Sequence, residues 1–228
     1  MKLTYYGHSV VQIETADTTI LVDPFISGNP HVEGIVVAGD FHPDVILITH
    51  AHGDHWGDTE DIARRTNALV VANHEIVTYL SGKTGHQRVH GMNVGGAYTF
   101  PWGTVKQTLA RHSSSFPDGT YGGNPNGYLL TVGDDVVYLA GDTAVFAEMA
   151  WIGEDHDIDV AFLPIGDCYT MGPEDAVRAA GMLKPAVTVP VHYNTFPPIE
   201  VDVASWLDRM VDAGHRGHVL RPGETLSI

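Results

Sequence analysis

Cysteine is almost absent from this sequence, because Cys168 is the only one in 228 residues. A single thiol excludes an internal disulfide framework and any metal site built from several cysteines. Long apolar runs are also missing, since none approaches the roughly 18 residues that a membrane-spanning helix needs. The first eight residues hold no continuous apolar segment, which argues against a secretory signal. We therefore expect a cytoplasmic protein that has no membrane partner.

Basic residues are scarce, with 12 Lys and Arg against 28 Asp and Glu, a formal net charge of −16. Proteins that bind nucleic acid or anionic membranes neutralise phosphates with clustered Lys and Arg. The sequence offers no such cluster, so we expect no nucleic-acid partner. The hydrophobic fraction of 43% is typical of a soluble globular protein. We expect a single domain over residues 1–228.

Histidine, in contrast, is abundant. The chain has 14 His, more than its Lys and Arg together. Because His is the commonest metal ligand in proteins, this excess of His favours the presence of a metal site.

The hydrophobic pattern is β-rich at first and then alternates between helix and strand, in two roughly similar halves. Strands are expected at residues 2–6, 9–14, 18–23, 44–49, 68–72, 97–100, 104–110, 127–132, 136–140, 159–164, 186–190, 217–220 and 225–228. Helices are expected at residues 59–66, 74–80, 144–152, 173–183 and 201–213. Two sheets stacked face to face, with helices on both outer faces, would satisfy this pattern. The fold class is therefore α+β, an αββα four-layer sandwich.

The segment His50-Ala-His-Gly-Asp-His55 places four metal-ligand side chains in six residues, directly after a buried strand. His50 and His52 are two apart in an extended segment, so their rings can point to one side. Gly53 then lets the backbone turn, which allows Asp54 and His55 to point elsewhere. Imidazole and carboxylate ligands suit Zn²⁺ and also Fe²⁺ or Mn²⁺.

This segment resembles the signature of the metallo-β-lactamase fold superfamily of dinuclear metallohydrolases. That superfamily also has a later His, an Asp after a strand and a last His after another strand. Matching positions occur in the same order in Ala110-Arg-His-Ser-Ser114, Leu139-Ala-Gly-Asp-Thr143 and Val189-Pro-Val-His-Tyr-Asn194. The phrases Tyr6-Gly-His-Ser9 and Leu21-Val-Asp-Pro24 are most similar to a branch of small metal-dependent hydrolases related to ascorbate-6-phosphate lactonase.

The resemblance implies seven ligands for two divalent metal ions, Zn²⁺ in the first place and Mn²⁺ or Fe²⁺ as alternatives. The first ion would be held by His50, His52 and His112, the second by Asp54, His55 and His192, with Asp142 bridging them. It also allows a homo-oligomer, because related small lactonases often associate.

The same resemblance implies a mechanism in which a metal-bridging hydroxide attacks a small-molecule ester, lactone or amide. Asp54 would orient this nucleophile. His8 is the candidate proton donor or substrate contact, because the family places its turn beside the metal ions. Tyr193 and Asn194 directly follow a ligand and are candidate substrate-binding residues. Asp23 and Thr143 are expected to fix the orientation of the ligands.

Three alternatives remain open at this stage. A phosphodiesterase could use the same site. A non-catalytic metal-binding sensor could keep the ligands without turnover. A di-iron oxygen or nitric-oxide reductase is a further possibility on this fold, but proteins of that kind carry Glu where this chain has His52.

Overall fold

A computed structural model describes all residues from 1 to 228. It contains a seven-stranded sheet in the order β13-β1-β2-β3-β4-β5-β6 and a six-stranded sheet in the order β12-β11-β10-β9-β8-β7. The strands of the first sheet are β1 (Lys2–Tyr5), β2 (Val11–Glu14), β3 (Thr19–Val22), β4 (Val45–Leu47), β5 (Leu69–Asn73), β6 (Val89–Met92) and β13 (Thr225–Ser227). Those of the second are β7 (Ala97–Phe100), β8 (Gly103–Leu109), β9 (Asn126–Val132), β10 (Asp135–Leu139), β11 (Val160–Pro164) and β12 (Val187–Val191).

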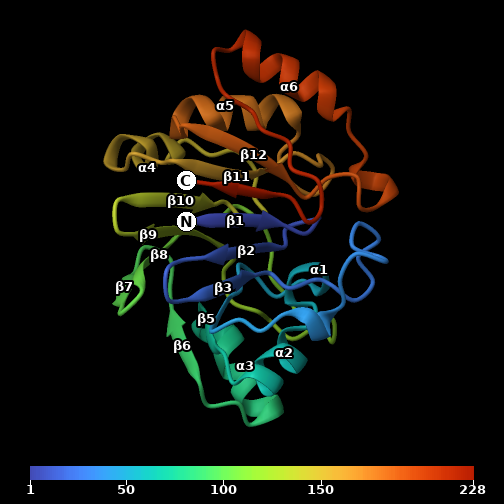
Figure 1. Ribbon diagram of the computed structural model, residues 1–228, viewed down its shortest axis with the longest axis vertical. Helices are drawn as coiled ribbons and strands as arrows, with labels where there is room; N and C mark the ends of the chain where they lie inside the picture. Colours follow the sequence, from blue (N-terminus) through green and yellow to red (C-terminus); the bar gives the residue numbers. More distant parts are fainter.

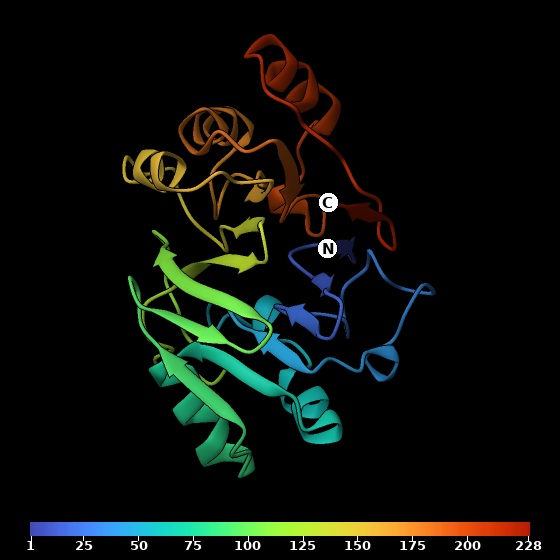
Figure 2. The ribbon, with the colours of Figure 1, turned by 60° about the vertical axis from the view of Figure 1, so that its left-hand side comes forward.

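Helices cover the outer face of each sheet (Figures 1 and 2). They are α1 (Gly53–Trp56), α2 (Thr59–Thr66), α3 (His74–Thr84), α4 (Met149–Asp155), α5 (Pro173–Leu183) and α6 (Val203–Asp212), with short 3₁₀ turns at Ala38–Asp40 and Pro197–Ile199. None of these helices combines the length and the apolar content that crossing a membrane requires.

Three apolar clusters hold the four layers together. Successive side chains of a strand point into different clusters. In β4, Val45 and Leu47 point into the cluster between the two sheets, whereas Ile46 points into the cluster under α2 and α3. A third cluster lies between the second sheet and α4, α5 and α6. Because strands such as β4 and β11 are buried on both faces, between the other sheet and a layer of helices, the αββα four-layer sandwich predicted from the sequence is confirmed.

The strands that carry the polar motifs end at one edge of the sandwich. β3 and β4 are parallel neighbours in the first sheet, and β10, β11 and β12 are parallel neighbours in the second. The hydroxyl of Tyr128 on β9 donates to the carbonyl of Ile48 across the sheets, at 2.7 Å. The amide of Asn126 donates to the carbonyl of Thr49 at 3.1 Å. These bonds fix the two sheets to each other directly before His50.

Some local expectations differ from the structure. Residues 217–220 form no strand, and only a single bridge joins Gly217 to Thr188. β6 was not predicted, because Val89–Met92 includes His90 and Gly91 and lacks an apolar pattern. The helix expected from residue 144 begins at Met149.

Burial of Tyr138 on β10 makes stability sensitive to alkali. Burial raises the pKa of this phenol to about 12. The unfolded chain loses this proton near pH 10, so between pH 10 and 12 the unfolded state binds fewer protons and the free energy of unfolding falls as pH rises.

We expect Tyr138→Phe to remove a fall of about 1.4 kcal/mol per pH unit in this window. Urea unfolding at pH 9, 10 and 11 measures the effect. The exposed Tyr98 provides the control Tyr98→Phe, which should keep the wild-type slope. An unchanged slope for Tyr138→Phe would contradict the prediction.

Candidate metal centre

Three imidazole nitrogens from two distant segments meet at the edge of the sandwich. His50 and His52 follow β4, and His112 follows β8. Nε2 of His50 lies 3.0 Å from Nδ1 of His52, which in turn lies 3.3 Å from Nε2 of His112. Nitrogen ligands about 2.0–2.1 Å from a tetrahedral zinc ion are themselves about 3.3 Å apart. The spacing of the three nitrogens therefore fits one metal ion.

A second group lies beside the first. The ligand-type atoms of His8, Asp54, His55 and His192 all fall within 4.8 Å of one another. The single helical turn α1, which starts after His52, carries both Asp54 and His55. The sequence predicted a turn at Gly53, and the structure shows it as this helical turn. His192 follows β12, so both sheets contribute to the group.

Asp142 lies between the two groups, after β10. Its Oδ1 is 3.3 Å from Nε2 of His55, and its Oδ2 is 3.0 Å from Nε2 of His192. The same Oδ2 is 3.6 Å from Nε2 of His112 and 3.9 Å from Nε2 of His50. One buried carboxylate thus faces nitrogens of both groups, as a bridging ligand would. The structure therefore brings together all seven side chains that the resemblance implied as ligands.

Hydrogen bonds outside the centre hold the imidazoles in orientation. Oδ2 of Asp23 lies 2.8 Å from Nδ1 of His55, and the same carboxylate accepts from the amide and the hydroxyl of Thr49. The Thr49 hydroxyl lies 3.0 Å from Nδ1 of His50. With Nδ1 engaged in this way, Nε2 of each ring points to the centre. Asp23 was expected from the sequence in this role, whereas Thr49 was not.

His8, a member of the second group, is fully buried. Its Nδ1 is 2.9 Å from the hydroxyl of Thr195, and its Nε2 is 3.1 Å from Oδ2 of Asp54. Its carbonyl accepts from the amide of His192 at 2.7 Å, which ties the two segments together. His8 and His192 both adopt positive φ, 54° and 53°, a conformation that is rare for residues other than Gly and concentrates at functional sites. Burial and the neighbouring His192 lower the pKa of His8 to about 4.

Charge within the centre is strongly polarised. Burial alone would lower the pKa of His192, but the Asp142 carboxylate outweighs it and raises the pKa to about 9. Burial also opposes the shift at His55, where Asp142 and Asp23 raise the pKa well above its ordinary value. In return His192 and His55 hold the pKa of Asp142 well below its usual range, although burial acts the other way. The carboxylates thus attract positive charge to the position between the two groups.

A metal ion fits this arrangement better than protons alone. Nε2 of His55 and Oδ1 of Asp142 are buried without a hydrogen-bond partner, although they face each other at 3.3 Å. A buried polar atom without a partner costs about 1–3 kcal/mol, and a cation bound where these ligands converge would satisfy both atoms. The donor set of imidazoles and carboxylates suits zinc and other divalent transition metals.

The side chains of Tyr193 and Asn194, the two candidate substrate-binding residues, lie outside the two ligand groups. Tyr193 is buried in the apolar cluster under α5 and α6. The side-chain carbonyl of Asn194 accepts from the amide of Val201 at 2.7 Å, which stabilises the turn after His192. Neither side chain forms a hydrogen bond with the imidazoles or carboxylates, and the role of both residues in binding a substrate stays a prediction.

Asp23→Asn tests the orientation of His55. The amide nitrogen would face Nδ1 of His55 in place of a carboxylate, so the ring loses the partner that fixes it. Asparagine tolerates the positive φ of 45° at this position. We expect affinity for Zn²⁺ to fall about 10–100-fold.

Competition with a chromophoric chelator measures this affinity. Asp44→Asn is the matched control, because the Asp44 carboxylate accepts a backbone amide of Thr19 on the exposed surface. Equal affinity in wild type and Asp23→Asn would refute the orienting role.

An αββα sandwich with such a centre at its edge defines the class of metal-dependent hydrolases of the metallo-β-lactamase fold. Residues 2–192 match the family model described as the beta-lactamase superfamily domain. The chain belongs to this family, and it is a metal-dependent hydrolase of the metallo-β-lactamase fold.

Relatives of similar length support the assignment. A UPF0173 metal-dependent hydrolase of Salinibacter ruber is 49% identical over 228 residues and all of both chains. A UPF0173 metal-dependent hydrolase of Thermus thermophilus is 47% identical over all of this chain and 99% of the relative. Among solved structures, a metallo hydrolase of the hyperthermophilic archaeon Ignicoccus hospitalis is 42% identical, with a TM-score of 0.88 over 99% of this chain and 97% of that one.

Proposed function

We propose that the chain is a dinuclear hydrolase that cleaves a small-molecule ester, lactone or amide. The observation that carries this proposal is the pair of ligand groups that share one carboxylate. Three nitrogens of His50, His52 and His112 converge, a second group gathers around His55 and His192, and Asp142 faces both. Two divalent ions, Zn²⁺ in the first place, would occupy the two groups.

Divalent ions held by these residues would acidify a water molecule and polarise the oxygen of the scissile group. The chain itself supplies the proton transfers. Asp54 is the partly exposed member of the second group, so its carboxylate can accept the proton of the attacking water. Nε2 of His8, 3.1 Å from Oδ2 of Asp54, can pass a proton on to the leaving oxygen. Thr195 holds the far side of the His8 ring during this transfer.

A substrate panel tests the proposal. It contains p-nitrophenyl esters, γ- and δ-lactones and bis-p-nitrophenyl phosphate, each assayed with Zn²⁺ and with Mn²⁺. We expect hydrolysis of esters or lactones that a chelator abolishes and added metal restores. Preferred turnover of bis-p-nitrophenyl phosphate would favour the phosphodiesterase alternative. Absence of metal-dependent turnover throughout the panel would contradict the proposal and favour a binding function.

A further inference from the structure

Access to the metal centre is one-sided. The Asp54 side chain is 30% exposed and that of His112 is 13% exposed. His52 is also partly exposed, whereas His50, His55, His192 and Asp142 are almost completely buried. A substrate must therefore approach from the side of Asp54, His52 and His112, and the surface around these three residues decides which substrates fit.

Two phenylalanine rings lie beside His8, a member of the second ligand group. The ring centroids of Phe25 and Phe196 lie 5.5 Å and 5.6 Å from that of His8, and 6.2 Å from each other. Phe25 follows β3 and Phe196 follows β12, so each sheet provides one ring. Both rings are half-buried, and Phe196 belongs to none of the three apolar clusters that hold the fold together. The core thus leaves Phe196 available to pack against another molecule.

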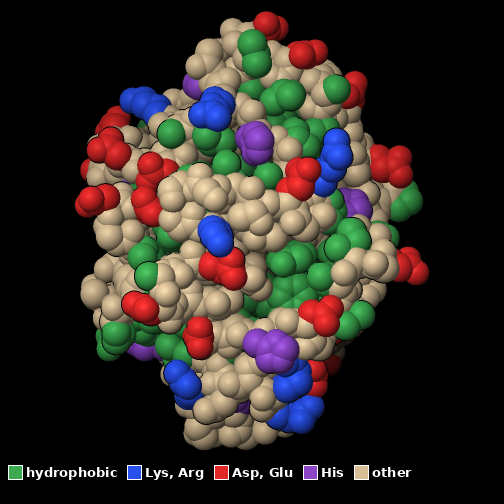
Figure 3. Space-filling model, viewed as in Figure 1, with side chains coloured by type: hydrophobic (Ala, Val, Ile, Leu, Met, Phe, Trp, Pro, Cys, Tyr) green, Lys and Arg blue, Asp and Glu red, His purple; other side chains and the backbone are tan.

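Cations are missing from the same region. Arg111 precedes His112, but its guanidinium lies 3.5 Å from Glu148 and over the ring of Phe146, toward the start of α4. No Lys or Arg forms a hydrogen bond or an ion pair with any residue of the two ligand groups. On the face shown in Figure 3, basic side chains stand singly or in small groups among acidic ones. A phosphate or carboxylate on the substrate would find no guanidinium or ammonium beside the centre.

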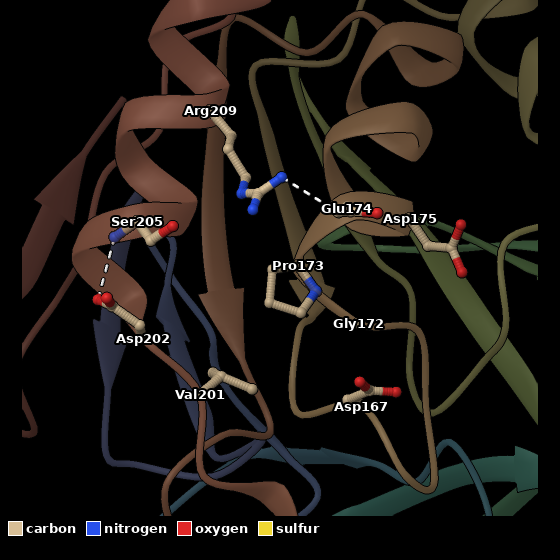
Figure 4. A pocket seen from close by; sticks show the side chains of 9 residues that line it. All are labelled: Asp167, Gly172, Pro173, Glu174, Asp175, Val201, Asp202, Ser205 and Arg209. Atoms are coloured by element: carbon tan, nitrogen blue, oxygen red, sulfur yellow. Dashed lines mark hydrogen bonds and ion pairs between the residues drawn. The ribbon is translucent and has the colours of Figure 1, made fainter.

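Carboxylates occupy the neighbouring surface instead. A pocket of about 470 Å³ lies between the starts of α5 and α6 (Figure 4). Its acidic lining consists of Asp167, Glu174, Asp175 and Asp202. Its one cation, Arg209, is paired with Glu174 at 2.8 Å. Gly166, directly before Asp167, packs against the carbonyl of His192, so this negative surface adjoins the centre.

We propose that the substrate carries an uncharged, apolar group that packs against Phe25 and Phe196 beside the metal centre. The inference rests on the proposed function, which it narrows to neutral esters or lactones with an apolar acyl part. The two half-buried rings offer apolar surface beside the second ligand group, and the acidic surroundings oppose a negative charge on the substrate.

Hydroxamates test the substrate class without turnover, because the hydroxamate group itself chelates metal ions. The probes are acetohydroxamate, hexanohydroxamate and the monohydroxamate of adipic acid, whose chain ends in a carboxylate. Calorimetry on the zinc-loaded protein should show that hexanohydroxamate binds about tenfold tighter than either of the other two. Phe196→Ala should remove most of this preference and leave acetohydroxamate binding unchanged. Tyr98→Ala, at an exposed ring on β7, is the control that should keep the preference.

A gain-of-binding variant guards against loss of folding as an explanation. The ratio of the affinity for the adipic probe to the affinity for hexanohydroxamate should be about tenfold higher in Phe196→Arg than in wild type. The same comparison in turnover uses the p-nitrophenyl esters of hexanoic and adipic acid, which share a leaving group.

The binding results distinguish a wrong metal centre from a wrong substrate class. If acetohydroxamate does not bind to the protein supplied with zinc, the proposed metal centre is wrong. If all three hydroxamates bind equally, or the adipic probe binds tightest, the inference about the apolar substrate is overturned and the metal centre stands.

Discussion

Asp142→Ala is expected to reduce the metal content from two ions per chain to one or none. Its carboxylate is 3% exposed and faces nitrogens of His55 and His192 at 3.0–3.3 Å, so no other group can replace it. Because the proposed hydrolysis would depend on both ions, we expect kcat/KM for esters to fall by a factor of about 10³ or more. Mass spectrometry of metal content and ester kinetics measure the two effects.

A matched control separates metal loss from misfolding. Asp134→Ala removes an exposed carboxylate in the hairpin before β10 and should keep both ions and full activity. Asp142→Asn keeps the shape of the side chain but not its charge, and should also lose metal. Retention of two ions by both Asp142 variants would contradict the bridging role.

His8→Asn is expected to lower kcat by a factor of about 10²–10⁴ while both metal ions stay bound. The imidazole would be lost from its place beside Asp54, and with it the proton that the leaving group needs. Asparagine suits the positive φ of 54° at this position better than alanine does, so the turn between β1 and β2 should persist.

Metal content distinguishes the two roles open to His8, whose ring also lies among the ligand-type atoms of the second group. Loss of one ion from His8→Asn would make His8 a ligand instead of a proton donor. Full activity with both ions present would refute either role. His218→Gln, at an exposed histidine, should behave as wild type.

The ligand set could be predicted from the sequence because its residues sit next to regular strands. Each of His50, His112, Asp142 and His192 follows a strand within a few residues, and parallel strands end at the same edge. The continuous apolar run of β4, in which Ile46 faces one layer and Leu47 the other, likewise predicted a strand buried on both faces, as the sandwich requires.

Contacts made by loops were harder to predict. Thr195 and Phe196 lie far from His8 in sequence, and only the path of the chain after β12 brings them to it. Asp58 stands at the N-cap position of α2, but its carboxylate accepts from the amides of Ile26 and Ser27 in the long loop after β3. Such partners depend on tertiary packing, which leaves no periodic signal in the sequence.

The central claim is that two metal ions bind at the shared edge of the sheets, and anomalous diffraction from crystals grown with Zn²⁺ tests it most directly. We expect two peaks, each about 2.0–2.1 Å from its nitrogen ligands. One should lie among His50, His52 and His112, the other beside Asp54, His55 and His192, with Asp142 between them. A map with no peak there, or with zinc only at other places on the surface, would contradict the account.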